Sequence, residues 1–353
     1  MYQSIAIEPF GETTAGEAVE AIVLANAAGM RVCVLTLGAT IQSVIVPDRN
    51  GFFADVTLGY PHAADYCNDP HYLGATIGRV ANRVAGGRFP LDGQSVQVTC
   101  NDGANSLHGG TQGFDKRCWT IADRRGGERP GVTLRLVSPH LDQGYPGTLT
   151  VTADFVLEPD NRLTIDYRAA TDRATMVNLT SHAYWNLHGE NAARGALDHL
   201  LEIPADSFLA IDAAAIPTGE IVPVAGSPFD FRLATPIADR IGANHPQIAM
   251  GRGYDHNWVL HPASGLRLAA RLSDPQSGRR LDVWSNQPGV QFYSGNYLGG
   301  AAGKSGRPYR PGDGIALEPQ NFPDCPNRPE FGSIRLDPGE TYHHRIEFAF
   351  SAA

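Results

Sequence analysis

Two segments of alternating apolar and polar residues, Leu149-Thr150-Val151-Thr152-Ala153-Asp154-Phe155-Val156-Leu157 and Leu163-Thr164-Ile165-Asp166-Tyr167, flank the turn-forming residues Pro159-Asp160-Asn161. Alternation with a period of two places successive side chains on opposite faces of a β-strand. Two such strands joined by a short turn rich in Pro, Asp and Asn are typical of a β-hairpin. The stretch therefore predicts an antiparallel pair.

The same pattern extends outward along the 353 residues, because 39 glycines and 25 prolines are spread over the whole chain and separate short strand candidates. Helical periodicity is scarce: only Pro61 to Asn68 and Pro236 to Ile241 suggest short helices. Strands without intervening helices predict antiparallel sheets, packed as a sandwich or closed as a barrel. With no linker or repeat visible, we expect one all-β domain over residues 1–353. The further strand candidates are Ala21–Ala25, Arg31–Leu37, Thr40–Val46, Asp55–Leu58, Ser95–Thr99, Val132–Val137, Leu266–Leu272, Leu281–Ser285, Val290–Tyr293 and His344–Phe350.

Charge and cysteine content exclude several classes of protein. The formal net charge of −9 argues against a nucleic-acid partner, which requires a basic face. The five cysteines are scattered and form no C-x-x-C pair, so neither a disulfide framework nor a zinc site is expected. Residues 1–10 lack the pattern of a secretory signal, and no apolar run is long enough to span a membrane. We therefore expect a cytoplasmic protein without a membrane partner.

A carboxylate follows a short apolar run near the C-terminus, in Gly314-Ile315-Ala316-Leu317-Glu318-Pro319-Gln320-Asn321-Phe322-Pro323-Asp324. Ile315 to Leu317 resembles the end of a buried strand, and a stiff proline-containing loop comes next. A strand end followed by such a loop holds a side chain in place, as a catalytic base requires. On this stretch alone, a solvent-facing Glu318 at a strand end is the more common arrangement.

Four other stretches carry polar and aromatic side chains suited to binding a ligand. Gly78–Gly87 contains Arg79, Asn82 and Arg83 among small residues, and Asn101–Gly110 contains His108 beside two glycines. In Gly251–Trp258, which includes Asp255, polar and aromatic residues alternate as in carbohydrate sites. Pro288–Asn296 offers the amides of Gln291 and Asn296. By itself, Gly78–Gly87 is equally compatible with a solvated loop that carries a structural arginine, and a lone loop histidine such as His108 is usually just exposed.

A fifth stretch, Asn178–Leu187, places an imidazole close to a phenol. If it forms a strand, His182 and Tyr184 project from one face, two residues apart. Such a pair suits proton transfer to an oxygen beside an aromatic surface for a sugar ring, although a half-buried sheet face with a hydrogen-bonded histidine is a credible alternative.

Other familiar motifs are absent or incomplete. Gly299–Ser305 is one residue short of a phosphate-binding P-loop and lacks its strand-to-helix context. His343 and His344 are adjacent on a predicted strand, so they point to opposite faces and form a poor metal pair.

Taken together, these stretches resemble the aldose 1-epimerase family, the galactose mutarotases, from about Gly29 to the C-terminus. The resemblance is carried, in the family's order, by GRVANRVAGG, NSLHGG with GFDKRCW, GYPG, NLTSHAYWNL, GYDHNW, PGVQFYSGN and LEPQNFPD. It implies a large antiparallel β-sandwich of the galactose mutarotase-like supersandwich type. It also implies an enzyme that interconverts the α and β anomers of a free aldose such as galactose or glucose, without metal or organic cofactor.

The resemblance also assigns residues. Glu318 matches the family's active-site glutamate, which we expect to be the base, and His182 matches its active-site histidine, which we expect to be the acid. The expected sugar-binding residues are Asn82, Arg83, His108, Tyr184, Asp255 and Gln291. Ser181 and Pro319 depart from the Asn and Thr that many members carry, which leaves the preferred sugar less certain than the reaction. We expect a monosaccharide substrate and a monomer or homodimer.

Three other functions remain open from the sequence. A glycoside hydrolase would use two carboxyl groups, for which Asp255 and Glu318 are available. A non-catalytic carbohydrate-binding protein would present the same polar and aromatic surface. An epimerase-like protein could also act on another sugar or a sugar phosphate; a hexose-6-phosphate epimerase would need an additional basic cluster at the pocket, which the sequence does not clearly show.

Overall fold

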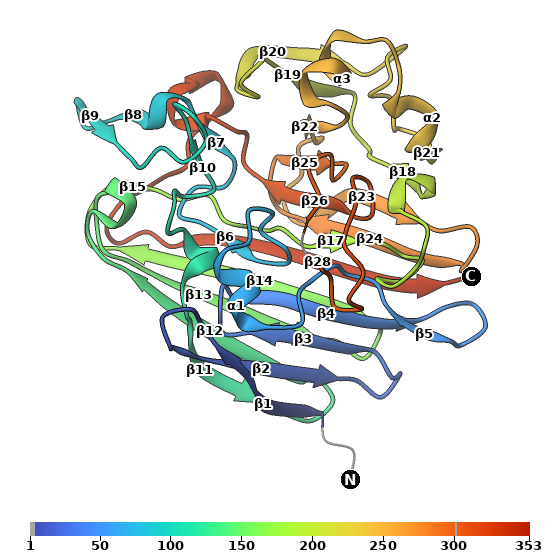
Figure 1. Cartoon of the computed structure of the whole chain (residues 1–353). Coiled ribbons are helices and arrows are strands. Elements are labelled where there is room, and N and C mark those ends of the chain that lie inside the picture. The colour runs from blue at the N-terminus through green and yellow to red at the C-terminus, as the bar shows by residue number, and fades with distance from the viewer. Residues whose placement is uncertain (1–3, 301) are drawn as a thin grey trace.

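Antiparallel sheets make up most of this computed structural model, which describes residues 4–300 and 302–353 (Figure 1). The N-terminal sheet has five strands, each paired with the next in the chain. Its strands are β1 (Ile5–Glu12), β2 (Ala18–Ala25), β3 (Arg31–Leu35), β4 (Thr40–Pro47) and β5 (Phe53–Asp55). The first of these strands was not predicted.

A nine-stranded sheet runs through the middle of the molecule. In spatial order it consists of β11 (Thr120–Arg125), β12 (Gly131–Ser138), β13 (Leu149–Leu157), β14 (Arg162–Thr171), β28 (Tyr342–Ala352), β24 (Arg279–Ser285), β23 (Arg267–Ser273), β18 (Leu200–Glu202) and β21 (Thr235–Pro236). The strands β13 and β14 form the predicted hairpin, with Leu157 opposite Leu163. That prediction is confirmed.

A six-stranded sheet carries most of the C-terminal motifs. Its order is β17 (Tyr184–Trp185), β26 (Ile315–Gln320), β25 (Gly289–Tyr293), β22 (Asp255–Val259), β19 (Ser207–Ile211) and β20 (Pro217–Pro223). Four two-stranded pairs complete the structure: β6 (Thr76–Ile77) with β16 (Thr180–Ser181), β7 (Arg83–Val84) with β10 (Ser106–Leu107), β8 (Arg88–Leu91) with β9 (Gln94–Gln97), and β15 (Thr175–Met176) with β27 (Arg335–Leu336).

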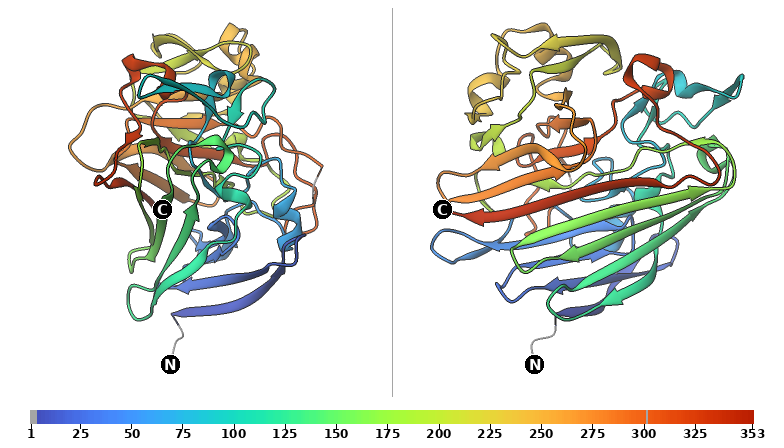
Figure 2. Two further views of the ribbon diagram at one scale, coloured as in Figure 1. Left: turned by 90° about the vertical axis from the view of Figure 1, so that its left-hand side faces the viewer. Right: turned by 180° about the vertical axis from the view of Figure 1, so that it is seen from behind.

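The three large sheets form a sandwich in which the nine-stranded sheet is shared (Figure 2). One part of it contacts the five-stranded sheet, where β13 meets β2, and another part contacts the six-stranded sheet, where β23 meets β25. Buried side chains from all three sheets, including Val34, Phe155, Phe292 and Phe348, belong to one apolar core. Burial of this apolar area is the main driving force for folding. The predicted all-β sandwich is confirmed.

The C-terminal strand β28 lies inside the nine-stranded sheet, between β14 and β24. His344, Ile346, Phe348 and Phe350 share its buried face, as the alternation predicts. His343 points the other way and lies 3.1 Å from an oxygen of Asp166. The prediction that the two adjacent histidines face opposite sides is therefore confirmed.

Helices are few and short: α1 (Ala63–Cys67), α2 (Ala238–Ile241) and α3 (Pro246–Gly251). The first two fall within the predicted segments, whereas α3 was not predicted; His245 caps it by accepting from the Gln247 N–H. The strand predicted over Asp55–Leu58 is wrong, because β5 ends at Asp55. Beyond it the backbone leaves the five-stranded sheet, and the Leu58 N–H donates to the Tyr184 carbonyl instead. In the described part of the chain, no helix is long and apolar enough to cross a membrane.

Candidate active site

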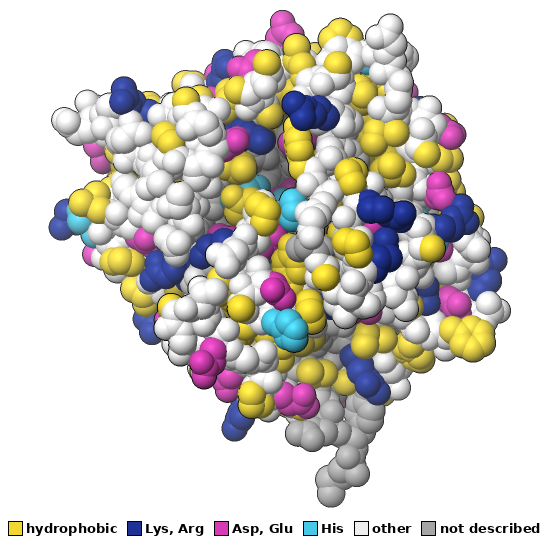
Figure 3. Space-filling view, viewed as in Figure 1, with side chains coloured by type: hydrophobic (Ala, Val, Ile, Leu, Met, Phe, Trp, Pro, Cys, Tyr) yellow, Lys and Arg dark blue, Asp and Glu magenta, His cyan; other side chains and the backbone are white. Residues whose placement is uncertain are grey.

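A pocket of about 450 Å³ opens between the loops around β7 and β10 and one face of β22, β25 and β26. The face drawn in Figure 3 is hollowed between these loops, and histidine and acidic side chains are visible in the recess. A volume of this size is in the range of small-molecule sites. Seven of the eight predicted site residues line it: Asn82, Arg83, His108, His182, Tyr184, Asp255 and Glu318. The eighth, Gln291, is buried behind Asp255.

Glu318 lies within β26 rather than at its end. The predicted strand end at Leu317 is wrong, because Glu318 pairs with Gln291 and the strand continues to Gln320, which pairs with Gly289. Only 2% of the Glu318 side chain is exposed. Burial raises the pKa of Glu318 well above its ordinary range; Asp255 adds to this shift and Arg83 opposes it. A carboxyl group with a raised pKa is suited to exchange a proton near neutral pH.

His182 faces Glu318 across the pocket, with 3.6 Å between His182 Nε2 and Glu318 Oε1. The expected continuous strand is interrupted at His182, because β16 pairs with β6 while β17 pairs with β26. The rings of His182 and Tyr184 nevertheless lie 4.9 Å apart. Burial is the main cause that lowers the pKa of His182 to about 4.

His108 and Asn82 hold each other in a left-handed backbone conformation, with φ values of 53° and 63°. The His108 N–H donates to the Asn82 carbonyl over 3.0 Å, and the Asn82 N–H donates to His108 Nδ1 over 3.2 Å. Because Nδ1 accepts a hydrogen bond, the ring hydrogen of neutral His108 belongs on Nε2. Its ring centre lies 5.2 Å from that of His182. His108 is thus arranged as a hydrogen-bond donor beside the Glu318–His182 pair.

Arg83 lies between two carboxylates. Its Nε donates to Asp102 over 2.8 Å, and its Nη1 lies 3.7 Å from Asp255 Oδ2. The other oxygen of Asp255 accepts from Gln291 Nε2 over 2.7 Å. These bonds fix a guanidinium and a carboxylate at the pocket wall, where both can bind hydroxyl groups.

Two other candidates from the same motifs serve the fold instead. Arg79 is 2% exposed, and its guanidinium donates to the Pro146 and Gly147 carbonyls and to Ser138 Oγ. The amide of Asn296 donates to the Gly251 and Tyr254 carbonyls. Both side chains are occupied by backbone groups outside the pocket, which the sequence did not reveal.

Sequence reasoning missed part of the aromatic rim of the pocket. His71, Tyr72 and Tyr297 line it, and the Tyr72 ring centre lies 4.6 Å from that of His108 and 5.9 Å from that of His182. Asp69 positions this segment by accepting from the His71 and Leu73 N–H groups. An Asp-Pro pair followed by two ring side chains was the available signal, since Asp and Pro favour turns.

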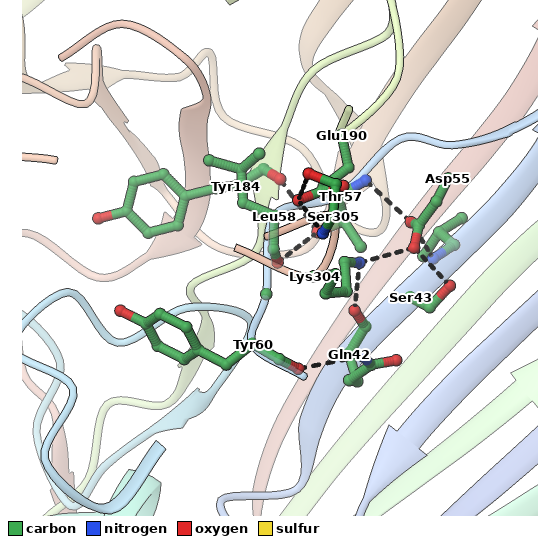
Figure 4. A network of polar contacts seen from close by, with 12 residues as sticks. Gln42, Ser43, Asp55, Thr57, Leu58, Tyr60, Tyr184, Glu190, Lys304 and Ser305 are labelled. Carbon is green, nitrogen blue, oxygen red and sulfur yellow. Dashed lines mark hydrogen bonds and ion pairs between the residues drawn. The ribbon is translucent and has the colours of Figure 1, made fainter. Parts of the chain in front are cut away.

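Lys304, from the incomplete P-loop motif, contacts the N-terminal sheet (Figure 4). Lys304 Nζ lies 2.6 Å from both Asp55 Oδ2 and the Gln42 carbonyl, so its charge is already paired. Thr57 Oγ1 donates to the Tyr184 carbonyl over 3.0 Å. The Lys304 contacts join this segment to β4 and β5, and the Thr57 bond holds the strand that carries Tyr184 against the residues that follow β5.

Pro319 is tolerated in β26 because β17 pairs only with Ile315 and Ala316, so the strand has a free edge at Pro319 on that side. There the Pro319 carbonyl accepts from Thr180 Oγ1 over 2.7 Å. The second departure from the family pattern, Ser181, is 1% exposed, and its hydroxyl has no partner within residues 4–300 and 302–353.

Two groups of side chains bring potential metal-ligand atoms within 4.8 Å of one another: His108, His182 and Glu318, and separately His188, His199 and Asp274. Sequence spacing could not reveal either group. In each, one histidine nitrogen accepts a backbone N–H: His108 Nδ1 from Asn82 and His199 Nε2 from Leu187. The other nitrogen of that ring then carries hydrogen, so metal ligation there would require removing it. The hydrogen bonding therefore favours neutral histidines over metal ligands.

Comparisons with known proteins agree with this geometry. The sequence model of the family described as "Aldose 1-epimerase" matches residues 20–349. The chain is 42% identical to the galactose mutarotase of Homo sapiens over 325 residues, which are 92% of each protein. It is 39% identical to the aldose 1-epimerase of Escherichia coli K12 over 340 residues, which are 96% of each. The crystal structure of galactose 1-epimerase from Lactobacillus acidophilus NCFM is 30% identical and superposes over 100% of both chains with a TM-score of 0.88.

The family match covers more than nine-tenths of the chain, and the identities extend over nearly the full length of the relatives. The predicted family resemblance is thereby confirmed, and its fold is the one observed. This protein belongs to the aldose 1-epimerase family.

Proposed function

We propose that the protein is an aldose 1-epimerase, or mutarotase, which interconverts the α and β anomers of a free aldose such as galactose or glucose. The observation that carries this proposal is the buried Glu318–His182 pair, 3.6 Å apart at the floor of a pocket lined by hydroxyl-binding groups. The family relationship supports the same activity.

The reaction needs one base and one acid. Glu318 removes the proton from the hydroxyl on C1 while His182 gives a proton to the ring oxygen, so the bond between C1 and the ring oxygen breaks. The C1–C2 bond rotates, and the ring closes on the other face of the aldehyde as the two groups exchange roles. A positioned acid or base typically contributes ~10²–10⁴-fold each.

The pair needs a single proton for this chemistry, carried either as carboxylate and imidazolium or as carboxyl and neutral imidazole. Burial raises the pKa of Glu318 and lowers the pKa of His182, so it favours the uncharged arrangement in the free site. The positive charge of Arg83 lowers the Glu318 pKa and favours the carboxylate. The reaction starts from the carboxylate–imidazolium arrangement, in which the shared proton lies on His182 and the Glu318 carboxylate is free to accept the C1 hydroxyl proton.

The sugar-holding residues favour a neutral monosaccharide. Arg83 is the one Lys or Arg among the described residues that line the pocket, and Asp102 and Asp255 offset its charge. A phosphate group would therefore meet carboxylates without a free cation to bind it. Asn82, Arg83, His108 and Asp255 would hold the sugar hydroxyls and keep the open-chain intermediate in place.

The proposal is tested by polarimetry of freshly dissolved α-glucose, α-galactose, xylose and arabinose, with and without the protein. We expect the optical rotation of at least one sugar to reach equilibrium faster in proportion to protein concentration. Sugar binding without acceleration would instead indicate a carbohydrate-binding protein. Cleavage of a nitrophenyl glycoside would indicate a hydrolase.

Dialysis against a chelator should leave the mutarotase activity unchanged. The reason is that His108 Nδ1 accepts from the Asn82 N–H, so the other ring nitrogen, Nε2, carries hydrogen and has no lone pair for a metal. The measurement compares rates before dialysis, after dialysis, and after addition of zinc or manganese. Activity that is lost on dialysis and restored by a metal would contradict the prediction.

We further propose a single domain over residues 1–353, in the cytoplasm, as a monomer or homodimer. The core that joins all three sheets supports one domain. The five cysteines lie within the described residues and are all free, which is compatible with a reducing compartment.

A further inference from the structure

On the sheet face that carries Glu318, a row of polar side chains includes two amides, those of Asn257 and Gln320, that the proposed reaction does not use. Asn257 of β22, Gln291 of β25 and Glu318 of β26 are directly opposite one another in the sheet register. Directly opposed residues point to the same face of a sheet, and so do residues two apart on one strand. Gln320 therefore shares this face with Glu318.

A glycine leaves room for the Asn257 side chain on this face. Gly289 pairs with Gln320, and a Cβ built on Gly289 would lie 2.3 Å from Asn257 Oδ1. The Asn257 side chain thus occupies the space above Gly289, next to the strand position of Gln320. A side chain at residue 289 would displace this amide.

These amides are buried, and their hydrogen-bonding capacity is unused. Asn257 is 1% exposed and Gln320 is 0% exposed. Both polar atoms of each amide lack a partner among residues 4–300 and 302–353, and so does Glu318 Oε2. Buried polar atoms are costly unless they are hydrogen-bonded to protein or internal water. Neither amide lines the pocket, so a sugar bound there is not their partner.

The carboxyl oxygen Oε2 of Glu318 likewise lacks a hydrogen-bond donor. Its Oε1 faces His182. The other charged or titratable groups nearby are Tyr184 of β17, Asp255 of β22, Arg83 of β7 and His108, which follows β10. The charge of Arg83 lowers the pKa of Glu318 electrostatically, while its guanidinium is bonded to Asp102. A buried carboxylate stays ionised when amide N–H groups donate to it.

We propose that Asn257 and Gln320 are positioning residues for Glu318. They hold Oε2 through an internal water, which accepts from the amide N–H groups and donates to Oε2, so that Oε1 is turned toward His182 and the sugar. By stabilising the carboxylate, they also oppose the effect of burial, which favours the protonated carboxyl. This inference rests on the proposed mutarotase function for its catalytic consequence, but not for its effect on the ionisation of Glu318.

The test uses Gln320→Met, which keeps the length of the side chain and removes both polar atoms. The readout is the pH titration of the Glu318 carboxyl carbon by NMR, with the signal assigned by its loss in Glu318→Gln. We expect its pKa to rise by about one unit or more, which is at least about tenfold in the acid dissociation constant. We also expect kcat at pH 7 to fall by about tenfold with little change in sugar affinity.

Gln287→Met is the matched control, because Gln287 is also a buried glutamine, 9% exposed, but lies before β25 and outside this row. It should leave the Glu318 titration unchanged. If Gln320→Met does not fold, Gln320→Asn, which keeps an amide but withdraws it from Glu318, should raise the pKa in the same direction. A folded Gln320 variant with an unchanged Glu318 pKa overturns the proposal. Failure of the unmodified protein to accelerate mutarotation would overturn the proposed function instead, and the NMR titration would still decide the inference.

Discussion

Replacement of Glu318 by glutamine should lower kcat by at least ~10²-fold, the lower end of the contribution from a positioned base. Glutamine keeps the shape and reach of the side chain but cannot accept the C1 hydroxyl proton. Sugar affinity should change far less, because binding is expected to rest mainly on Asn82, Arg83, His108 and Asp255 rather than on the base. The rate is measured by polarimetry and the affinity by calorimetry on the same preparation.

The melting temperature of Glu318→Gln supplies the control. Because Glu318 is buried with a raised pKa, removal of its charge should not destabilise the fold. A variant that is folded, binds sugar and still turns over near the parent rate would end the assignment of Glu318 as the base. A variant that loses both rate and folded structure would point to a structural role.

Replacement of His182 by asparagine should also lower kcat by at least ~10²-fold, since asparagine retains a polar group but has no titratable proton to give to the ring oxygen. As with Glu318→Gln, sugar affinity is expected to suffer much less. Near-parental turnover in a folded His182→Asn protein would refute the role of His182 as the acid.

The pH profile of kcat/KM separates this role from a purely structural one. The unmodified pair gains a second proton as pH falls through about 4, the value to which burial lowers the His182 pKa, so activity should fall there. Without His182, the residual activity depends on Glu318 alone, whose pKa burial raises. The acid limb of the His182→Asn profile should therefore move to higher pH. A limb that stays in place would contradict the coupling of the two groups.

The two arginines of the Gly78–Gly87 stretch show where sequence reasoning stops. Both have the same chemistry and lie four residues apart, yet Arg79 binds the Pro146 and Gly147 carbonyls while Arg83 binds Asp102 and reaches the pocket. Nothing local distinguishes them, because their partners come from distant parts of the chain. Family resemblance selected Arg83 correctly as a pocket residue; its role in binding sugar stays a prediction.

The stretch around His182 shows a similar limit. The sequence predicted that His182 and Tyr184 lie side by side, and the rings are 4.9 Å apart. It also suggested one strand, but the chain changes partners between β16 and β17. Partner choice depends on β6 and β26, which are more than 100 residues away in opposite directions, so no local pattern records it.

By itself, the sequence determined the all-β class, the hairpin of β13 and β14, and the buried face of β28. These features follow from side-chain alternation and turn residues, which act over a few residues. Only the tertiary structure decided that Glu318 lies inside a strand, that it faces His182 at 3.6 Å, and that Asn257 and Gln320 share its sheet face. The physical reason is that strand register and burial arise from pairing and packing between distant segments, and these set both the distances and the pKa values on which the chemistry depends.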